Sequence, residues 1–234
     1  MILRPLALAA FLAALLAVDT QVDARQQLAL GALTWVALAL ACRAASPELR
    51  AQAFVVVCVA TGAEVVGSLI WGVYHYRLDN LPSFVPPAHG LVYLAGVALC
   101  TAAGRHRQTL VRVALVAVLA WGLAGVTILP RSDVAGAIGA VLLALFLLRG
   151  RAPAIYAGVF LVVAALELYG TAIGTWTWEA VVPGTRVTDG NPPSGVASGY
   201  VWFDLVALAR APRVLTLVRA VRSRRAPRAQ HDRA

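Results

Sequence analysis

Apolar residues occupy most of the chain in eight long segments, which short polar stretches separate. The segments cover residues 2–18, 27–45, 52–73, 86–103, 109–129, 133–149, 153–176 and 196–211. Most of them approach the ~20 residues that cross a bilayer as an α-helix. The pattern predicts an all-α, polytopic membrane bundle of eight transmembrane helices, or seven if residues 2–18 are a cleaved signal peptide.

The composition supports the same class of protein. Of the 234 residues, 60% are hydrophobic and only 13% are charged, and the mean hydropathy is +0.77. Such a chain has too little polar surface to coat a soluble globule. We therefore expect a multi-pass protein of the cell membrane, surrounded by membrane lipid.

The distribution of charge predicts the orientation. All 20 basic residues are arginines, and they concentrate at Arg4, in the loops near residues 43–50, 104–108 and 149–151, and at the C-terminus. The alternate loops carry mostly aspartate and glutamate. Cytoplasmic loops are enriched in basic residues, so eight spans with both termini in the cytoplasm are expected.

The C-terminal tail carries most of the net charge of +9. Beside a membrane span, a basic run favours contact with anionic lipid headgroups over nucleic acid, so no nucleic-acid partner is expected. The last 25 residues contain eight arginines: Arg210, Arg213, Arg219, Arg222, Arg224, Arg225, Arg228 and Arg233.

Two parts of the chain share one motif, which consists of a glutamate, two spaced glycines, an alternating aromatic pair and a double proline. The pattern predicts two parallel four-helix repeats, residues 1–104 and 105–211, followed by a basic cytoplasmic tail, residues 212–234. The first copy contains Glu64, Gly67, Gly72, Tyr74, Tyr76, Pro86 and Pro87, and the second contains Glu167, Gly170, Gly174, Trp176, Trp178, Pro192 and Pro193.

Three carboxylates lie inside apolar segments, where an ionisable group is costly and indicates a functional site. They are Glu64, Glu167 and Asp204. A carboxyl group in an apolar environment tends to keep its proton, and a pair of such groups can divide the roles of acid and base. We predict that these three residues are catalytic, together with His89, which is placed to orient a carboxylate or a water.

Aromatic residues surround the predicted acids. They form either a belt at the membrane interface or the lining of a substrate chamber, where their faces would stabilise a cation. The predicted substrate-binding residues are Trp71, Tyr74, Tyr76, Tyr169, Trp176, Trp178 and Trp202.

Glycines and prolines near these aromatic residues suggest simpler structural roles. Gly67, Gly170 and Gly174 are expected to allow close helix packing. The proline-rich loops are either rigid connectors or lids over a cavity, and Asn191 is expected to cap the eighth helix, which favours the connector.

No metal-ligand spacing, phosphate-binding loop or nucleophile elbow occurs, so neither a metal nor a cofactor is expected. The residues instead favour protonation of a C=C bond in an apolar isoprenoid lipid, followed by attack of water or of an internal alkene. The outcome would be hydration or cyclisation. A proton-coupled carrier of a small molecule or lipid, and a non-catalytic accessory subunit, remain as alternatives.

Residues 60–100 resemble one known family. The string formed by Glu64, Gly67, Gly72, Tyr74 and Tyr76 is similar to membrane-embedded carotenoid biosynthesis proteins of the carotenoid 1,2-hydratase (bisanhydrobacterioruberin hydratase) type. The resemblance implies addition of water to a terminal C=C bond of a carotenoid, without a metal. The chain departs from the family pattern in its glycine spacing, its short connections and the His89–Gly90 pair after the double proline, so a membrane isoprenoid cyclase is also considered.

Overall fold

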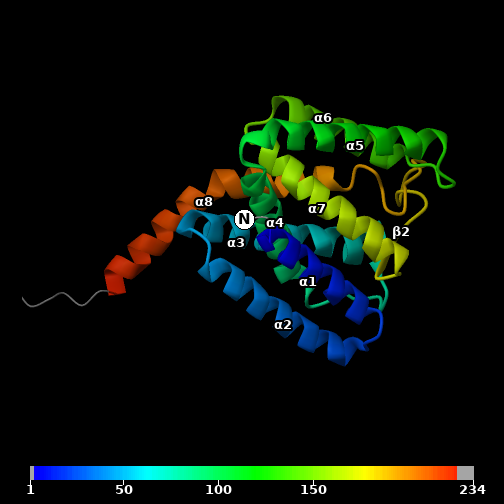
Figure 1. Cartoon of the computed structure of the whole chain (residues 1–234). Helices are drawn as coiled ribbons and strands as arrows, with labels where there is room; N and C mark the ends of the chain where they lie inside the picture. Colours follow the sequence, from blue (N-terminus) through cyan, green and yellow to red (C-terminus); the bar gives the residue numbers. More distant parts are fainter. Residues whose placement is uncertain (1–2, 226–234) are drawn as a thin grey trace, which may run out of the picture.

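The computed structural model describes residues 3–225, and these residues are helical apart from loops and two short strands. All eight predicted apolar segments are helices, so the all-α class is confirmed (Figure 1). The α-helices are α1 (Leu3–Asp19), α2 (Ala24–Arg43), α3 (Pro47–Glu64), α4 (Val85–Ala103), α5 (Arg107–Thr127), α6 (Val134–Arg149), α7 (Pro153–Ala172) and α8 (Ala197–Arg225). A π-helix η1 (Val65–Trp71), a 3-10 turn η2 (Gly104–His106) and strands β1 (Tyr74–Tyr76) and β2 (Trp176–Trp178) complete the elements.

Three helical runs are long and apolar enough to cross a membrane. Within the described part of the chain they cover Pro47–Trp71, Val85–Thr127 and Pro153–Ala172, and Val134–Arg149 is a shorter apolar helix. The run Val85–Thr127 joins α4 and α5, although Gly104 between them has a φ of 51°. These helical runs are consistent with a membrane protein. The number of eight membrane spans remains a prediction.

Short polar side chains define where the helices begin. Asp23 accepts hydrogen bonds from the backbone N–H groups of Arg25 and Gln26, and the Gln26 side chain accepts one from the Asp23 backbone, which forms a capping box. Ser46 caps α3 directly before Pro47, whose fixed φ suits the first helical position. These local signals separate α1, α2 and α3.

The two halves of the chain share one core. The larger buried cluster contains residues from all eight α-helices. Helix α3 of the first half packs on α8 of the second, and α4 packs on α7. In Figure 1, α1 and α2 lie on one side of these inner helices, and α5 and α6 lie on the other. The predicted boundary at residue 104 therefore does not separate two independent cores.

Small residues allow the close approach of α4 and α7. A side chain at Gly96 would overlap Val159, and one at Gly158 would overlap the carbonyl of Gly96. The prediction that Gly67, Gly170 and Gly174 serve this purpose was wrong. Gly174 follows the end of α7 with a φ of 77°, a backbone conformation that favours glycine at a helix end.

A buried carboxylate organises the long loop between β2 and α8. Asp133 accepts hydrogen bonds from the backbone N–H groups of Gly136 at 3.0 Å, Gly190 at 2.8 Å and Ser194 at 2.8 Å. The loop is thereby tied to the start of α6, as expected of a rigid connector. Asn191 does not cap α8, which begins at Ala197; its side chain accepts a hydrogen bond from the Trp178 backbone instead.

Asp189 in the same loop makes stability depend on pH. Burial, followed by the nearby charge of Asp133, raises the pKa of Asp189 to about 6. The folded state holds the Asp189 carboxyl proton more tightly than the unfolded state does. The stabilisation of the fold by protonated Asp189 is therefore fully present below pH ~4, and it is lost as the pH rises through the folded pKa. We expect Asp189→Asn to raise the unfolding temperature at pH 8 and to change it little at pH 3.5. Equal shifts at both pH values would contradict this reading.

The predicted tail begins inside a helix. Helix α8 continues without interruption across Pro212 to Arg225, and it extends away from the bundle in Figure 1. Residues 226–234, with Arg228 and Arg233, lie outside the described part of the chain.

Candidate functional site

The two copies of the motif meet at their aromatic pairs. Strands β1 and β2 pair antiparallel, with Tyr74 opposite Trp178, His75 opposite Thr177 and Tyr76 opposite Trp176. Two further backbone hydrogen bonds extend the pairing on either side, from Arg77 to Thr175 at 3.0 Å and from Glu179 to Val73 at 2.9 Å. The strand pairs and backbone hydrogen bonds are thus arranged symmetrically on the two sides of the central pair, His75 and Thr177.

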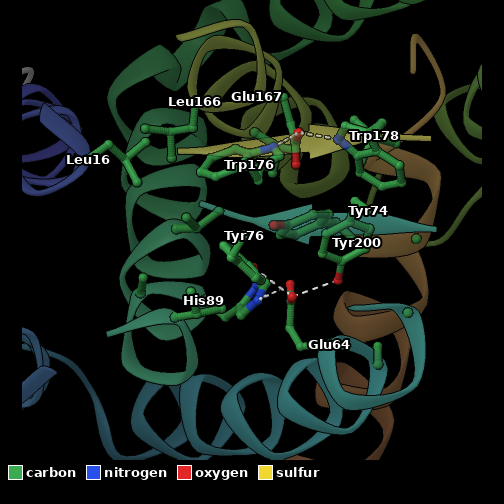
Figure 2. A pocket seen from close by; sticks show the side chains of 18 of the residues that line it. Leu16, Glu64, Tyr74, Tyr76, His89, Leu166, Glu167, Trp176, Trp178 and Tyr200 are labelled. Carbon is green, nitrogen blue, oxygen red and sulfur yellow. Dashed lines mark hydrogen bonds and ion pairs between the residues drawn. The ribbon is translucent and has the colours of Figure 1, made fainter. Parts of the chain in front are cut away.

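A cavity of about 380 Å³ lies next to this strand pair. Its lining comes from α1, α3, η1, α4, α7, α8 and both strands, and it is mostly apolar. Glu64, Glu167 and His89 all line it, and Figure 2 shows the two glutamates on opposite sides of the strands. The structure therefore brings three of the four predicted catalytic residues to one cavity.

Glu64 is surrounded by groups that can donate hydrogen bonds. Its Oε2 atom accepts from the hydroxyl groups of Tyr74 at 2.6 Å and Tyr76 at 2.7 Å, and its Oε1 atom lies 2.9 Å from Nε2 of His89. Glu64 is only 9% exposed. Glu64 thus accepts two tyrosine hydroxyl hydrogen bonds, and it accepts a third from His89 when Nε2 carries the hydrogen.

Glu167 has fewer partners. Its Oε2 atom accepts hydrogen bonds from the indole N–H groups of Trp176 at 2.9 Å and Trp178 at 3.2 Å. An indole can only donate, so Oε2 is the accepting oxygen. Within residues 3–225 the two hydrogen bonds to the Glu167 carboxyl group both end on Oε2, so Oε1 is the oxygen that is free to carry a proton.

The π-helix η1 compensates for a difference in length between the two copies. Ten residue positions separate Glu64 from its tyrosine partner Tyr74, whereas nine separate Glu167 from Trp176. A π-helix closes its hydrogen bonds over one more residue than an α-helix and often marks a functional site. The extra residue is therefore accommodated between Glu64 and Gly72, and both aromatic pairs reach their glutamates.

The glycines after each glutamate make room for the aromatic rings. A side chain at Gly67 would lie 3.1 Å from the Tyr74 ring, and one at Gly170 would overlap the Trp176 ring. Each aromatic ring therefore lies against the backbone of the helical segment at the glycine that follows its glutamate. This role replaces the predicted helix-packing role of Gly67 and Gly170.

We expect Gly170→Ala to displace Trp176 and to weaken its hydrogen bond to Glu167. Insertion of an extra methyl group into a packed site typically costs about 1–3 kcal/mol of folding free energy. Tryptophan fluorescence and thermal unfolding would detect the change. Gly62→Ala on α3 is the matched control, since nothing lies within 4 Å of a side chain there. Equal unfolding temperatures for the two variants would contradict the steric argument.

Four of the predicted aromatic residues line the cavity as pairs: Tyr74 with Tyr76, and Trp176 with Trp178. Trp71 also lines it and donates its indole N–H to the carbonyl of Pro183 at 3.1 Å. Contacts with buried carboxyl groups favour a chamber lining over a simple interfacial belt for the two pairs.

Tyr169, Trp202 and Asp204 lie outside the cavity lining, contrary to their predicted place in the site. Trp202 is 57% exposed and packs edge-on against Phe146, with ring centroids 5.6 Å apart. Tyr169 and Trp202 are exposed, whereas Glu167 on α7 and Tyr200 on α8 line the cavity. Asp204 is buried one helical turn beyond the cavity residue Tyr200.

Sequence reasoning missed several lining residues. Tyr200 and Phe203 of α8 line the cavity, and their ring centroids lie 5.4 Å and 6.1 Å from that of His89. Helix α1 contributes Leu12, Leu15 and Leu16. The available signal is the spacing of Gly199, Tyr200 and Phe203, since residues three or four apart share one face of a helix.

No group of three or more His, Cys, Asp or Glu side chains within residues 3–225 is arranged to hold a metal ion. No protein-family model matches the chain, and the searches of curated proteins and of solved structures gave no match either. The candidate site is therefore defined by its own geometry: two carboxyl groups with different hydrogen-bond partners in one apolar cavity.

Proposed function

We propose that the chain is an integral membrane enzyme that protonates a C=C bond of an apolar isoprenoid or carotenoid-like lipid, leading to hydration or cyclisation. The observation that supports this proposal most strongly is the unequal environment of two carboxyl groups in one cavity. Pairs of titratable groups with different environments are typical of acid and base partners.

Glu167 is the general acid in this proposal. Its Oε2 atom accepts two indole hydrogen bonds, and its Oε1 atom is free to hold the proton. The O–H bond of Glu167 breaks as the proton adds to one alkene carbon, which leaves a carbocation at the other. Faces of Trp176, Trp178 and Tyr74 in the cavity lining stabilise that cation.

Glu64 is the general base. Two tyrosine hydroxyl groups and His89 support its charged form. In a hydration, a water attacks the carbocation and loses a proton to Glu64. In a cyclisation, an internal alkene attacks, and Glu64 takes a proton from a carbon next to the new cation. The cycle is completed when Glu64 releases its proton to water and Glu167 takes up a proton from water.

The proposed enzyme spans the membrane eight times with both termini in the cytoplasm, and its arginine-rich end contacts anionic headgroups. The antiparallel pairing of β1 with β2, and the matched contacts of each glutamate with its own aromatic pair, support two related four-helix repeats. The mostly apolar lining of the cavity supports an apolar substrate.

A proton-coupled carrier is the second candidate. The π-helix η1 interrupts regular α-helical geometry directly after Glu64, and irregular backbone next to an intramembrane acid is also found in transporters. In that case the same carboxyl groups would bind the coupling proton, and no lipid would be converted.

Mass spectrometry of lipid extracts distinguishes these functions. An isoprenoid-producing host would express the wild type, Glu64→Gln or Glu167→Gln at equal levels. Hydration predicts a product heavier by one water, and cyclisation predicts an isomer of equal mass; either product should vanish in both variants. Unchanged lipids in cells with the wild-type protein would contradict the enzyme and favour the carrier or an accessory role.

A further inference from the structure

A second set of buried polar groups lies between the cavity and the end of the bundle where α3 begins. We name it the inner polar cluster; it consists of Gln52, Tyr93, Tyr156 and Asp204, one residue from each of α3, α4, α7 and α8. None of the four lines the cavity. All four are buried, and Asp204 is only 1% exposed.

Asp204 has an unusual environment within this cluster. Neither of its carboxyl oxygens has a hydrogen-bond partner among the described residues, and the buried hydroxyl of Tyr156 has none either. Tyr200 precedes Asp204 by one turn of α8, and Tyr93 and Tyr156 belong to the same buried cluster as Val201 and Ala207, which flank Asp204 on α8. Helix α6, which also packs on α8, presents only apolar side chains between Val134 and Leu148.

A charged carboxylate without a partner is very costly in such a place, and the neutral acid is the favoured form. Buried polar groups without protein partners are commonly bridged by internal water. Asp204 and Tyr156 therefore form a setting in which a protonated carboxyl group and water can exchange a proton.

On each of two helices, a residue of the inner polar cluster follows a cavity residue by four positions. On α8, Tyr200 lines the cavity and Asp204 follows four residues later; on α4, His89 lines the cavity and Tyr93 follows four residues later. Residues at this spacing share one helix face about 6 Å apart along the axis. Asp204 and Tyr93 thus lie one helical turn beyond the cavity residues Tyr200 and His89.

The other side of the cluster leads to the helix end. Tyr93 donates a hydrogen bond to Oε1 of Gln52 at 3.0 Å. Gln52 lies four residues after Glu48, which is exposed in the first turn of α3. Polar groups therefore follow one another from the exposed end of α3 to the cavity.

We propose that Asp204 carries protons between the cavity and the Glu48 end of the bundle, through Tyr200 on one side and through Tyr93, Tyr156 and Gln52 on the other. Asp204 gives its proton to the oxygen of Tyr200 while Tyr200 passes its own hydroxyl proton to a carboxylate in the cavity. Asp204 regains a proton from water held by Tyr156 and Tyr93. This role of the relay rests on the proposed enzyme function. There, the relay replaces the proton that Glu167 loses in each turnover and carries away the proton that Glu64 gains.

Infrared spectroscopy of the purified full-length protein without substrate tests this proposal. We expect a C=O stretching band of a protonated carboxylic acid that is lost in Asp204→Asn and kept in Glu167→Gln. On transfer to D2O the band should shift, and Tyr93→Phe and Gln52→Leu should slow that shift about tenfold, the effect of one lost hydrogen bond of ~1.4 kcal/mol. Thr61→Val, which removes a hydroxyl of α3 outside the cluster, should not slow it.

A carboxylic acid spectrum that is identical in the wild type and in Asp204→Asn would overturn the proposal, and so would equal exchange rates in the wild type, Tyr93→Phe and Gln52→Leu. If Asp204→Asn does not fold, the exchange rates of Tyr93→Phe and Gln52→Leu still test whether the proton relay exists. Because no substrate is present, these results are independent of whether the protein converts an isoprenoid.

Discussion

Replacement of Glu167 by glutamine should reduce product formation by about 10²–10⁴-fold, the range typical for removal of a general acid. The glutamine side chain keeps the shape of glutamate, and its amide oxygen can still accept hydrogen bonds from Trp176 and Trp178. It has no acidic proton to transfer to an alkene. Product formation by the purified protein in detergent or lipid, at saturating substrate, measures the effect.

Trp178→Phe is the matched control for this variant. It removes the longer of the two indole hydrogen bonds, at 3.2 Å, but keeps the carboxyl group and an aromatic ring. A neutral environment with one donor fewer still permits a protonated Glu167, so the loss of activity should be far smaller. Wild-type activity in Glu167→Gln would exclude Glu167 as the acid.

Replacement of Asp133 by alanine should give the largest loss of stability, a decrease of about 3–9 kcal/mol in the free energy of unfolding. The variant leaves three buried N–H groups, those of Gly136, Gly190 and Ser194, without their acceptor. An unsatisfied buried donor costs about 1–3 kcal/mol. Denaturant or thermal unfolding followed by tryptophan fluorescence measures the change.

Asp23→Ala provides the comparison, because Asp23 is an exposed helix cap in the loop between α1 and α2. Loss of such a cap typically costs about 1 kcal/mol. Similar unfolding free energies for the two variants would show that the carboxylate of Asp133 does not hold the loop between β2 and α8.

The helices could be predicted from the sequence because each apolar segment is long and is bounded by polar or proline-containing turns. The cavity could be predicted in part. An acid in an apolar segment has few stable partners, so the repeated glutamates and aromatic pairs indicated that Glu64 and Glu167 belong together. The pairing of Tyr76 with Trp176 and of Tyr74 with Trp178 is a three-dimensional consequence of that motif.

Other features depend on tertiary contacts that have no local signature. The π-helix η1 arises because the first copy holds one more residue between its glutamate and its aromatic pair, a detail visible only when the two copies are compared closely. Trp202 and Asp204 are two residues apart on α8, and helix geometry turns them to different faces. Periodicity alone does not show which of those faces meets the cavity.

Deuterium labelling tests the central claim most directly. The purified enzyme would convert a candidate isoprenoid in D2O, and the product would be examined by mass spectrometry and NMR after back-exchange in H2O. Protonation of a C=C bond by Glu167 predicts a single deuterium bound to carbon at the protonated position in each product molecule, whether the product is hydrated or cyclised. A product that forms without carbon-bound deuterium would contradict the proposed acid–base mechanism.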